Sequence, residues 1–160
     1  MTSLVAVTLL GGLAVLGAPP EFGTVGEAVA MADRPQVRVL FSAEDPKGQL
    51  AAFAALLRQV MARVGPVHRI LADAARSDQD AASLLAEIAR QRHEGQQGIA
   101  RSLAGSGALR PGLKERDAAD IIHALASPEV YGLLVTDRGW RAERYENWLK
   151  SILVDQLLPR

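Results

Sequence analysis

The sequence predicts an all-α protein, a single bundle of helices. Its composition is 49% apolar but only 4% aromatic. Alanine and leucine are abundant, and both residues have a high helix propensity but gain little in a strand. Apolar residues recur at three- and four-residue spacing from residue 50 onward, which is typical of helices with one buried face. A chain of 160 residues is also long enough for one domain that buries about two-thirds of its unfolded surface.

The first twenty residues carry no charged side chain, so every charge lies between Glu21 and Arg160. A secretory signal peptide needs a basic region before its apolar core, and this run has none. A membrane-spanning helix needs about 20 apolar residues, whereas this run contains several glycines and ends at Pro19-Pro20. We interpret residues 1–20 as a buried first helix or a leader and residues 18–32 as a loop. Residues 1–33 together then form an apolar leader that contains glycine and proline, and residues 34–160 form the helical domain. Residues 36–41 alternate like a strand, but a lone strand has no partner, so a helical turn or an extended lead-in is expected.

Three helices are expected in the first half of the domain. Asp45-Pro46 is a helix start, with Asp45 as the cap and Pro46 at the first helical position. Gly65-Pro66 should end this helix and start a second one, which Ser77-Asp78 breaks. The third helix is expected from Asp80 to Leu103, with a stop at residues 105–107. Its polar middle contains Gly95 and Gly98, a weak point where the helix bends or another group comes close.

The second half predicts a helix over 114–126 and a second start at Ser127-Pro128, with Ser127 as the cap. Arg138-Gly139-Trp140 should turn the chain into a last helix over 142–158. That helix presents a broad apolar stripe with a tyrosine and a tryptophan in it, too large to remain exposed. The stripe must therefore contact the rest of the domain or a second copy of the chain.

Six short motifs follow one another along the chain: R-V-G-P at 63–66, A-R-Q-R at 89–92, A-L-R-P-G-L at 108–113, S-P-E-V-Y at 127–131, R-G-W at 138–140 and E-R-Y-E-N-W-L at 143–149. In order and spacing they are similar to the C-terminal half of TetR-family (tetracycline-repressor-like) transcriptional regulators. The resemblance covers about residues 34–157.

The resemblance implies an all-α domain of the TetR C-terminal type that binds an effector and forms a homodimer. Its last two helices, 114–137 and 142–158, would pair with their mates in a four-helix interface, for which we expect Ile121, Leu125, Leu133, Leu134, Tyr145, Trp148, Leu149 and Ile152. Its middle helices would enclose a small, mostly apolar effector. The expected lining combines apolar bulk with a few polar tips, namely Phe53, Leu57, Met61, Ile88, His123 and Tyr131. Equally, Phe53, Leu57 and Met61 are candidates for plain core.

DNA is a doubtful partner. Family members begin with a three-helix DNA-binding domain of helix-turn-helix type, and the stretch before Arg34 has neither the length nor any basic side chain for one. The 18 basic and 18 acidic residues also cancel to a net charge of zero, whereas nucleic-acid binders usually carry a basic face.

No enzyme is predicted. The absence of cysteine excludes disulfides, thiol nucleophiles and cysteine metal sites. Asp120 and His123 lie one helical turn apart, but di-iron bundles need two such pairs with further carboxylates, so we expect no metal and no cofactor. The expected protein is a cytoplasmic homodimer with no membrane partner. The alternative is a membrane-associated or structural helical interaction protein anchored through residues 1–20.

Overall fold

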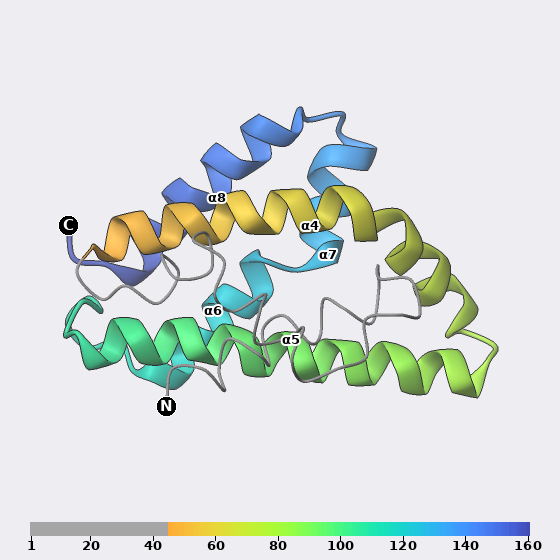
Figure 1. Cartoon of the computed structure of the whole chain (residues 1–160), viewed down its shortest axis with the longest axis horizontal. Helices are drawn as coiled ribbons and strands as arrows, with labels where there is room; N and C mark the ends of the chain where they lie inside the picture. Colours follow the sequence, from red (N-terminus) through yellow and green to blue (C-terminus); the bar gives the residue numbers. More distant parts are fainter. Residues whose placement is uncertain (1–44) are drawn as a thin grey trace, which may run out of the picture.

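The computed structural model describes residues 45–160, and each regular element among them is helical (Figure 1). In chain order the elements are α4 (Pro46–Ala74), α5 (Gln79–Gly105), α6 (Glu115–Leu125), α7 (Pro128–Tyr131), the π-helical segment η1 (Gly132–Asp137) and α8 (Ala142–Leu157). The predicted all-α helical bundle is thereby confirmed. The predictions for the leader, for residues 36–41 and for an anchor at residues 1–20 lie outside the described residues.

The two long helices form the frame of the bundle. Figure 1 shows α5 returning antiparallel to α4, with α8 along the opposite side of α4. α6 packs mainly on α5 and also contacts α8, so the short helices close the space between the long ones. Arg58 of α4 donates from Nε to Oε2 of Glu146 on α8 at 2.5 Å. Gln49 of α4 donates to the hydroxyl of Ser102 on α5 at 3.1 Å.

The core lies where the start of α4 meets the end of α5. Its fully buried side chains come from four helices: Leu50 on α4, Ile99 and Leu103 on α5, Ile122 on α6, and Tyr145, Leu149, Leu153 and Leu157 on α8. Each large aliphatic side chain buried in this way contributes roughly 1.5–3 kcal/mol through the hydrophobic effect. The cavity described below begins at the edge of this core, since Phe53, Leu57 and Met61 belong both to the core cluster and to the cavity lining.

The helix α4 continues through Gly65-Pro66, so the prediction that this pair separates two helices is wrong. Proline has no N–H and cannot donate to the carbonyl of Ala62, which normally breaks or kinks a helix. The apolar face continues across it, however, with Met61, Val64 and His68 all buried. Packing of that face therefore holds the helix together, and Figure 1 shows α4 bending toward the start of α5 in its last third.

Most other boundaries follow the capping chemistry of the sequence. The side chain of Asp78 accepts from Ala81 N–H at 2.9 Å, and the hydroxyl of Ser127 accepts from Val130 N–H at 3.2 Å. Gly139, at the corner before α8, has φ of +67°, a conformation that other residues rarely adopt. Asp45 precedes α4 as expected, but its side chain makes no capping hydrogen bond. The π-helical geometry of η1 had no counterpart in the sequence-based expectation.

Candidate ligand-binding site

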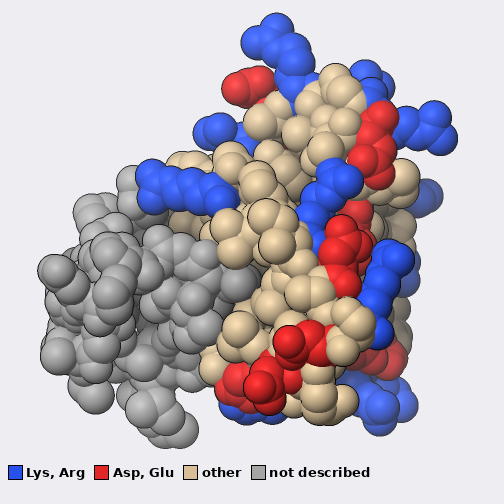
Figure 2. Space-filling model, turned by 90° about the vertical axis from the view of Figure 1, so that its right-hand side faces the viewer, with Lys and Arg blue, Asp and Glu red and all other residues tan. Residues whose placement is uncertain are grey.

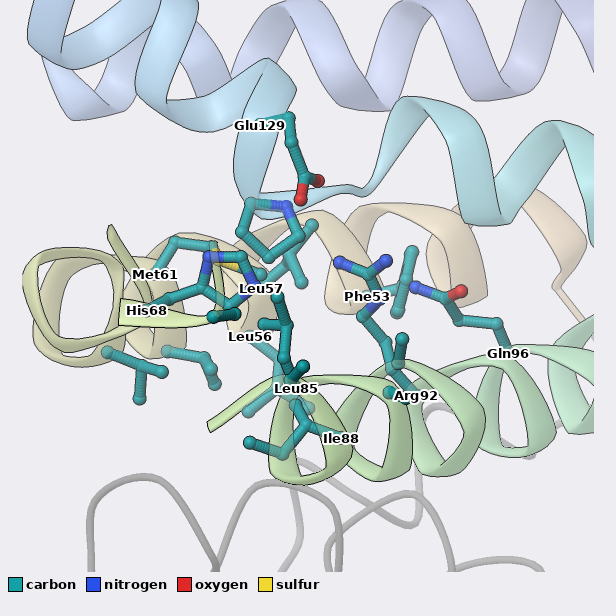
Figure 3. Close-up of a pocket in the computed structure, with 17 residues that line it drawn as sticks. Phe53, Leu56, Leu57, Met61, His68, Leu85, Ile88, Arg92, Gln96 and Glu129 are labelled. Atoms are coloured by element: carbon teal, nitrogen blue, oxygen red, sulfur yellow. The ribbon is translucent and has the colours of Figure 1, made fainter. Parts of the chain in front are cut away.

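A cavity of about 510 Å³ lies between α4, α5 and α7. Figure 3 shows side chains from all three elements directed toward it. Its α4 wall is made of Phe53, Leu56, Leu57, Val60, Met61, Val64 and His68, its α5 wall of Ala82, Leu85, Ala86, Ile88, Ala89, Arg92 and Gln96, and Ala75, Pro128 and Glu129 complete it. The volume falls in the range of about 300–1,000 Å³ typical of sites for small molecules.

The cavity exists because small residues face large ones across the two long helices. α5 presents Ala82, Ala86 and Ala89 to the cavity, and their small side chains fill little of the space in front of α4. Close packing normally leaves few voids of this size in a protein interior. The alternation of alanine with Leu85 and Ile88 therefore keeps one end of the bundle open while the other end is filled.

Polar side chains gather at the α6–α7 side of the cavity. Arg92 Nη2 lies 3.4 Å from Nε2 of His123 on α6, and His123 Nδ1 lies 2.8 Å from Oε1 of Gln96. Since Gln96 Oε1 can only accept, the hydrogen of neutral His123 belongs on Nδ1, and Nε2 is left to accept from Arg92. Figure 3 shows the carboxylate of Glu129 directed toward the same region from α7. His123 thus contacts both Arg92 and Gln96 without lining the cavity itself.

Burial controls the charge of these groups. It lowers the pKa of His123 from 6.5, assisted by the positive charge of Arg92 and by His93, and opposed by Glu129 and Asp120. It also lowers the pKa of His68, with Glu129 opposing and Arg92 assisting the shift. The pKa of Arg92 is lowered by burial too, against the effect of Glu129, but a guanidinium stays protonated in proteins. At neutral pH the lining therefore contains a neutral His68 beside the fixed cation of Arg92, and His123 behind the lining is neutral as well.

Acidification should destabilise the fold through these histidines. Their pKa values in the folded chain lie below the 6.5 of the unfolded chain. Between the folded and the unfolded pKa, the unfolded state therefore binds more protons than the folded state. The histidines make their full contribution to the free energy of unfolding above pH 6.5, and this contribution falls as the pH drops from 6.5 through the folded pKa. The loss amounts to at most about 1.4 kcal/mol per histidine for each pH unit in that window. Urea unfolding at about pH 7.5 and about pH 5.5 measures it.

The matched control is the double variant His68→Gln/His123→Gln. It removes both titrating groups, so its free energy of unfolding should fall less between the two pH values than that of the parent chain. An equal fall in both proteins would assign the acid sensitivity to other groups.

Four of the six predicted ligand-binding residues line the cavity: Phe53, Leu57, Met61 and Ile88. His123 lies behind the wall, as described above. Tyr131 borders a separate cavity of about 490 Å³ between the end of α4 and η1, and its ring packs edge-on against Tyr145 with the centroids 4.9 Å apart. Neither His123 nor Tyr131 lines the main cavity.

Sequence reasoning missed the polar lining residues His68, Arg92, Gln96 and Glu129. The spacing contains a signal for two of them. Arg92 and Gln96 follow Ile88 at intervals of four, so all three share one face of α5. A charged residue on the same face as a buried isoleucine is the pattern that would have marked Arg92.

The predicted interface residues divide into two groups. Tyr145 and Leu149 are fully buried within the chain, against α4 and the rest of the core, so neither can contact a second copy in this structure. The helical period identified the apolar face of α8 but not what covers it. By contrast, Leu133 is 52% exposed, and the remaining predicted positions are only half-buried: Ile121, Leu125, Leu134, Trp148 and Ile152.

Two further properties concern possible sites and partners. Within residues 45–160, no group of three or more histidine, aspartate or glutamate side chains is arranged to hold a metal ion. The segments Pro46–Ala74 and Glu115–Asp137 are long and apolar enough to cross a membrane by length and composition, a property that core helices of soluble domains share.

Comparison with known proteins gives no match: no family model, no curated protein and no solved structure is similar to this chain. These comparisons do not identify a TetR-family relationship, so the resemblance to that family stays an expectation from the sequence motifs.

Proposed function

We propose that this chain is a ligand-binding and homodimerisation domain of a TetR-like transcriptional regulator. The observation that supports it most is the cavity between α4, α5 and α7, which combines apolar walls with a few convergent polar groups. Such a combination is the usual form of a small-molecule site. The ligand is a small, mostly apolar molecule, and the expected location of the protein is the cytoplasm.

The homodimer is the second part of the proposal. Leu133 on η1 is exposed, and Trp148 and Ile152 on α8 are covered only in part within the chain. Pairing of η1 and α8 with the same elements of a second copy would bury this apolar surface, which favours association. This version of the interface leaves out Tyr145 and Leu149, because both are already used in the core.

DNA is left out of the proposal. On the face shown in Figure 2, acidic and basic side chains of the described residues lie side by side, without a broad area of one sign. Nucleic-acid affinity depends on a basic surface that neutralises several phosphates. The face in Figure 2 offers no such basic surface.

Two measurements on the full chain test the proposal. Light scattering at micromolar concentration should give twice the chain mass of 17.1 kDa, and a clean monomer would rule out the homodimer. The neutral fluorescent probe N-phenyl-1-naphthylamine should bind one site per chain and raise the melting temperature, with the stabilisation growing as the logarithm of its concentration over Kd. Lack of binding by this probe, together with no response to a series of other neutral apolar compounds, would refute the ligand-binding role.

A further inference from the structure

Arg92 is the one arginine that the cavity lining contains, and its charge is not compensated by an ion pair within residues 45–160. Its Nε atom is buried without a hydrogen-bond partner, and its Nη2 atom has only the neutral His123 at 3.4 Å. Removing a charge from water is costly unless the charge is paired. A guanidinium does not release its proton, so a bound anion would stabilise Arg92, on which the Glu129 carboxylate acts only from beyond ion-pair distance.

We propose that the cavity binds an amphipathic monocarboxylate, with the carboxylate on the Arg92 guanidinium and the apolar chain between α4 and α5. This inference rests on the proposed ligand-binding function and specifies the ligand class. A planar guanidinium binds a carboxylate through two parallel N–H···O bonds, the strongest common side-chain pairing for such a group. The walls beyond Arg92 are aliphatic and aromatic, which suits a hydrocarbon chain.

Gln96 and His68 fit the same assignment. The oxygen of Gln96 accepts from His123 Nδ1, so its amide nitrogen is the end available to a ligand, and Figure 3 shows that end on the side of Arg92. His68 lines the cavity as a neutral imidazole that can donate one hydrogen bond. The polar end thus offers one full positive charge and neutral donors.

Glu129 limits the charge that the site accepts. Its carboxylate faces the polar end from α7 but lies beyond ion-pair distance of Arg92, and the residue is exposed. Water and salt screen an exposed charge more than a buried one, so Glu129 weakens but does not cancel the attraction to a single carboxylate. A second negative charge on the ligand would meet Glu129 without a further cation to offset it.

The test is displacement of N-phenyl-1-naphthylamine from the full chain by ligands of equal length and different charge. Decanoate should bind at least about tenfold more tightly than decanol or decyltrimethylammonium, since a hydrogen bond to a charged group is worth that factor or more. Affinity should also rise about fourfold for each added CH₂ from hexanoate to decanoate, until the chain fills the cavity.

Variants locate the carboxylate. Arg92→Gln should remove the preference for decanoate over decanol, and Arg92→Lys should reduce it, while both variants still bind decanol. The matched control is Arg90→Gln on the same helix, because Arg90 is exposed and paired with Glu87 and Glu94, and it should keep the full preference. Glu129→Gln should increase decanoate affinity without changing that of decanol.

The outcomes separate this inference from the proposed function. If the probe binds but decanol competes as well as decanoate, or if Arg92→Lys and Glu129→Gln leave the preference unchanged, the carboxylate assignment is refuted and the cavity remains a site for neutral ligands. If neither the probe nor any amphiphile binds the parent chain, the ligand-binding function itself fails.

Discussion

Replacing Ala89 with tryptophan should abolish ligand binding while leaving the fold intact. Ala89 lines the cavity from α5, and the indole ring would occupy the space that the ligand needs. A ligand that buries roughly 150 Å² of apolar surface gains about 4 kcal/mol from burial, so its exclusion should weaken probe binding at least about 100-fold. Fluorescence titration with N-phenyl-1-naphthylamine measures the change, and circular dichroism with thermal melting checks the fold.

The control for this variant is Ser83→Trp, which adds the same ring at an exposed position six residues earlier on α5. Its Kd for the probe should match that of the parent chain. Unchanged binding by Ala89→Trp would show that the probe occupies another site, for instance the second cavity beside Tyr131.

Replacing Leu149 with alanine should lower the free energy of unfolding by about 3–5 kcal/mol. Leu149 is fully buried on α8, packed in the cluster that joins α8 to α4. A leucine-to-alanine change at such a position loses the transfer free energy of the side chain and leaves a cavity. Urea unfolding at fixed protein concentration measures the effect, since the stability of a dimer depends on concentration.

The matched variant is Leu133→Ala, where the same atoms are removed from a side chain that is 52% exposed. The loss of stability within the chain should stay below about 1 kcal/mol, whereas a weaker dimer would appear in light scattering. If Leu149→Ala instead dissociates a dimer with little loss of stability, Leu149 belongs to an interface, as the sequence had suggested.

The local chemistry of the sequence was sufficient for most of the fold. Helical periodicity placed the long helices, and the side chains of Asp78 and Ser127 begin their helices as such residues usually do. Pro66 was misjudged because a proline is a local signal, whereas the continuous buried face from Met61 to His68 acts through tertiary packing. The π-helical turns of η1 have no periodic signature that separates them from an α-helix over so few residues.

The site was predictable only in its apolar part. Phe53, Leu57, Met61 and Ile88 have the size and spacing of residues that face the interior, and they do line the cavity. Arg92 was missed because an arginine on a helix is usually solvated, and only the three-dimensional arrangement places His123 and Gln96 around it. Periodicity shows which face of α8 is buried but not its neighbour, so Tyr145 and Leu149 were assigned to a second copy rather than to α4.

The proline in α4 has a consequence for the dimensions of the cavity. Phe53, Leu57 and Met61 precede Pro66, whereas His68 follows it, so the α4 wall consists of two segments of one helix on either side of a missing hydrogen bond. The angle between those segments sets the distance from His68 to the α5 wall. A helix with one fewer backbone hydrogen bond at this point resists a change in that angle less than an unbroken helix does. The break in hydrogen bonding lies in the wall itself. For the ligand-binding role proposed above, a tilt of the last turns of α4 would therefore change the length of the site without repacking the core.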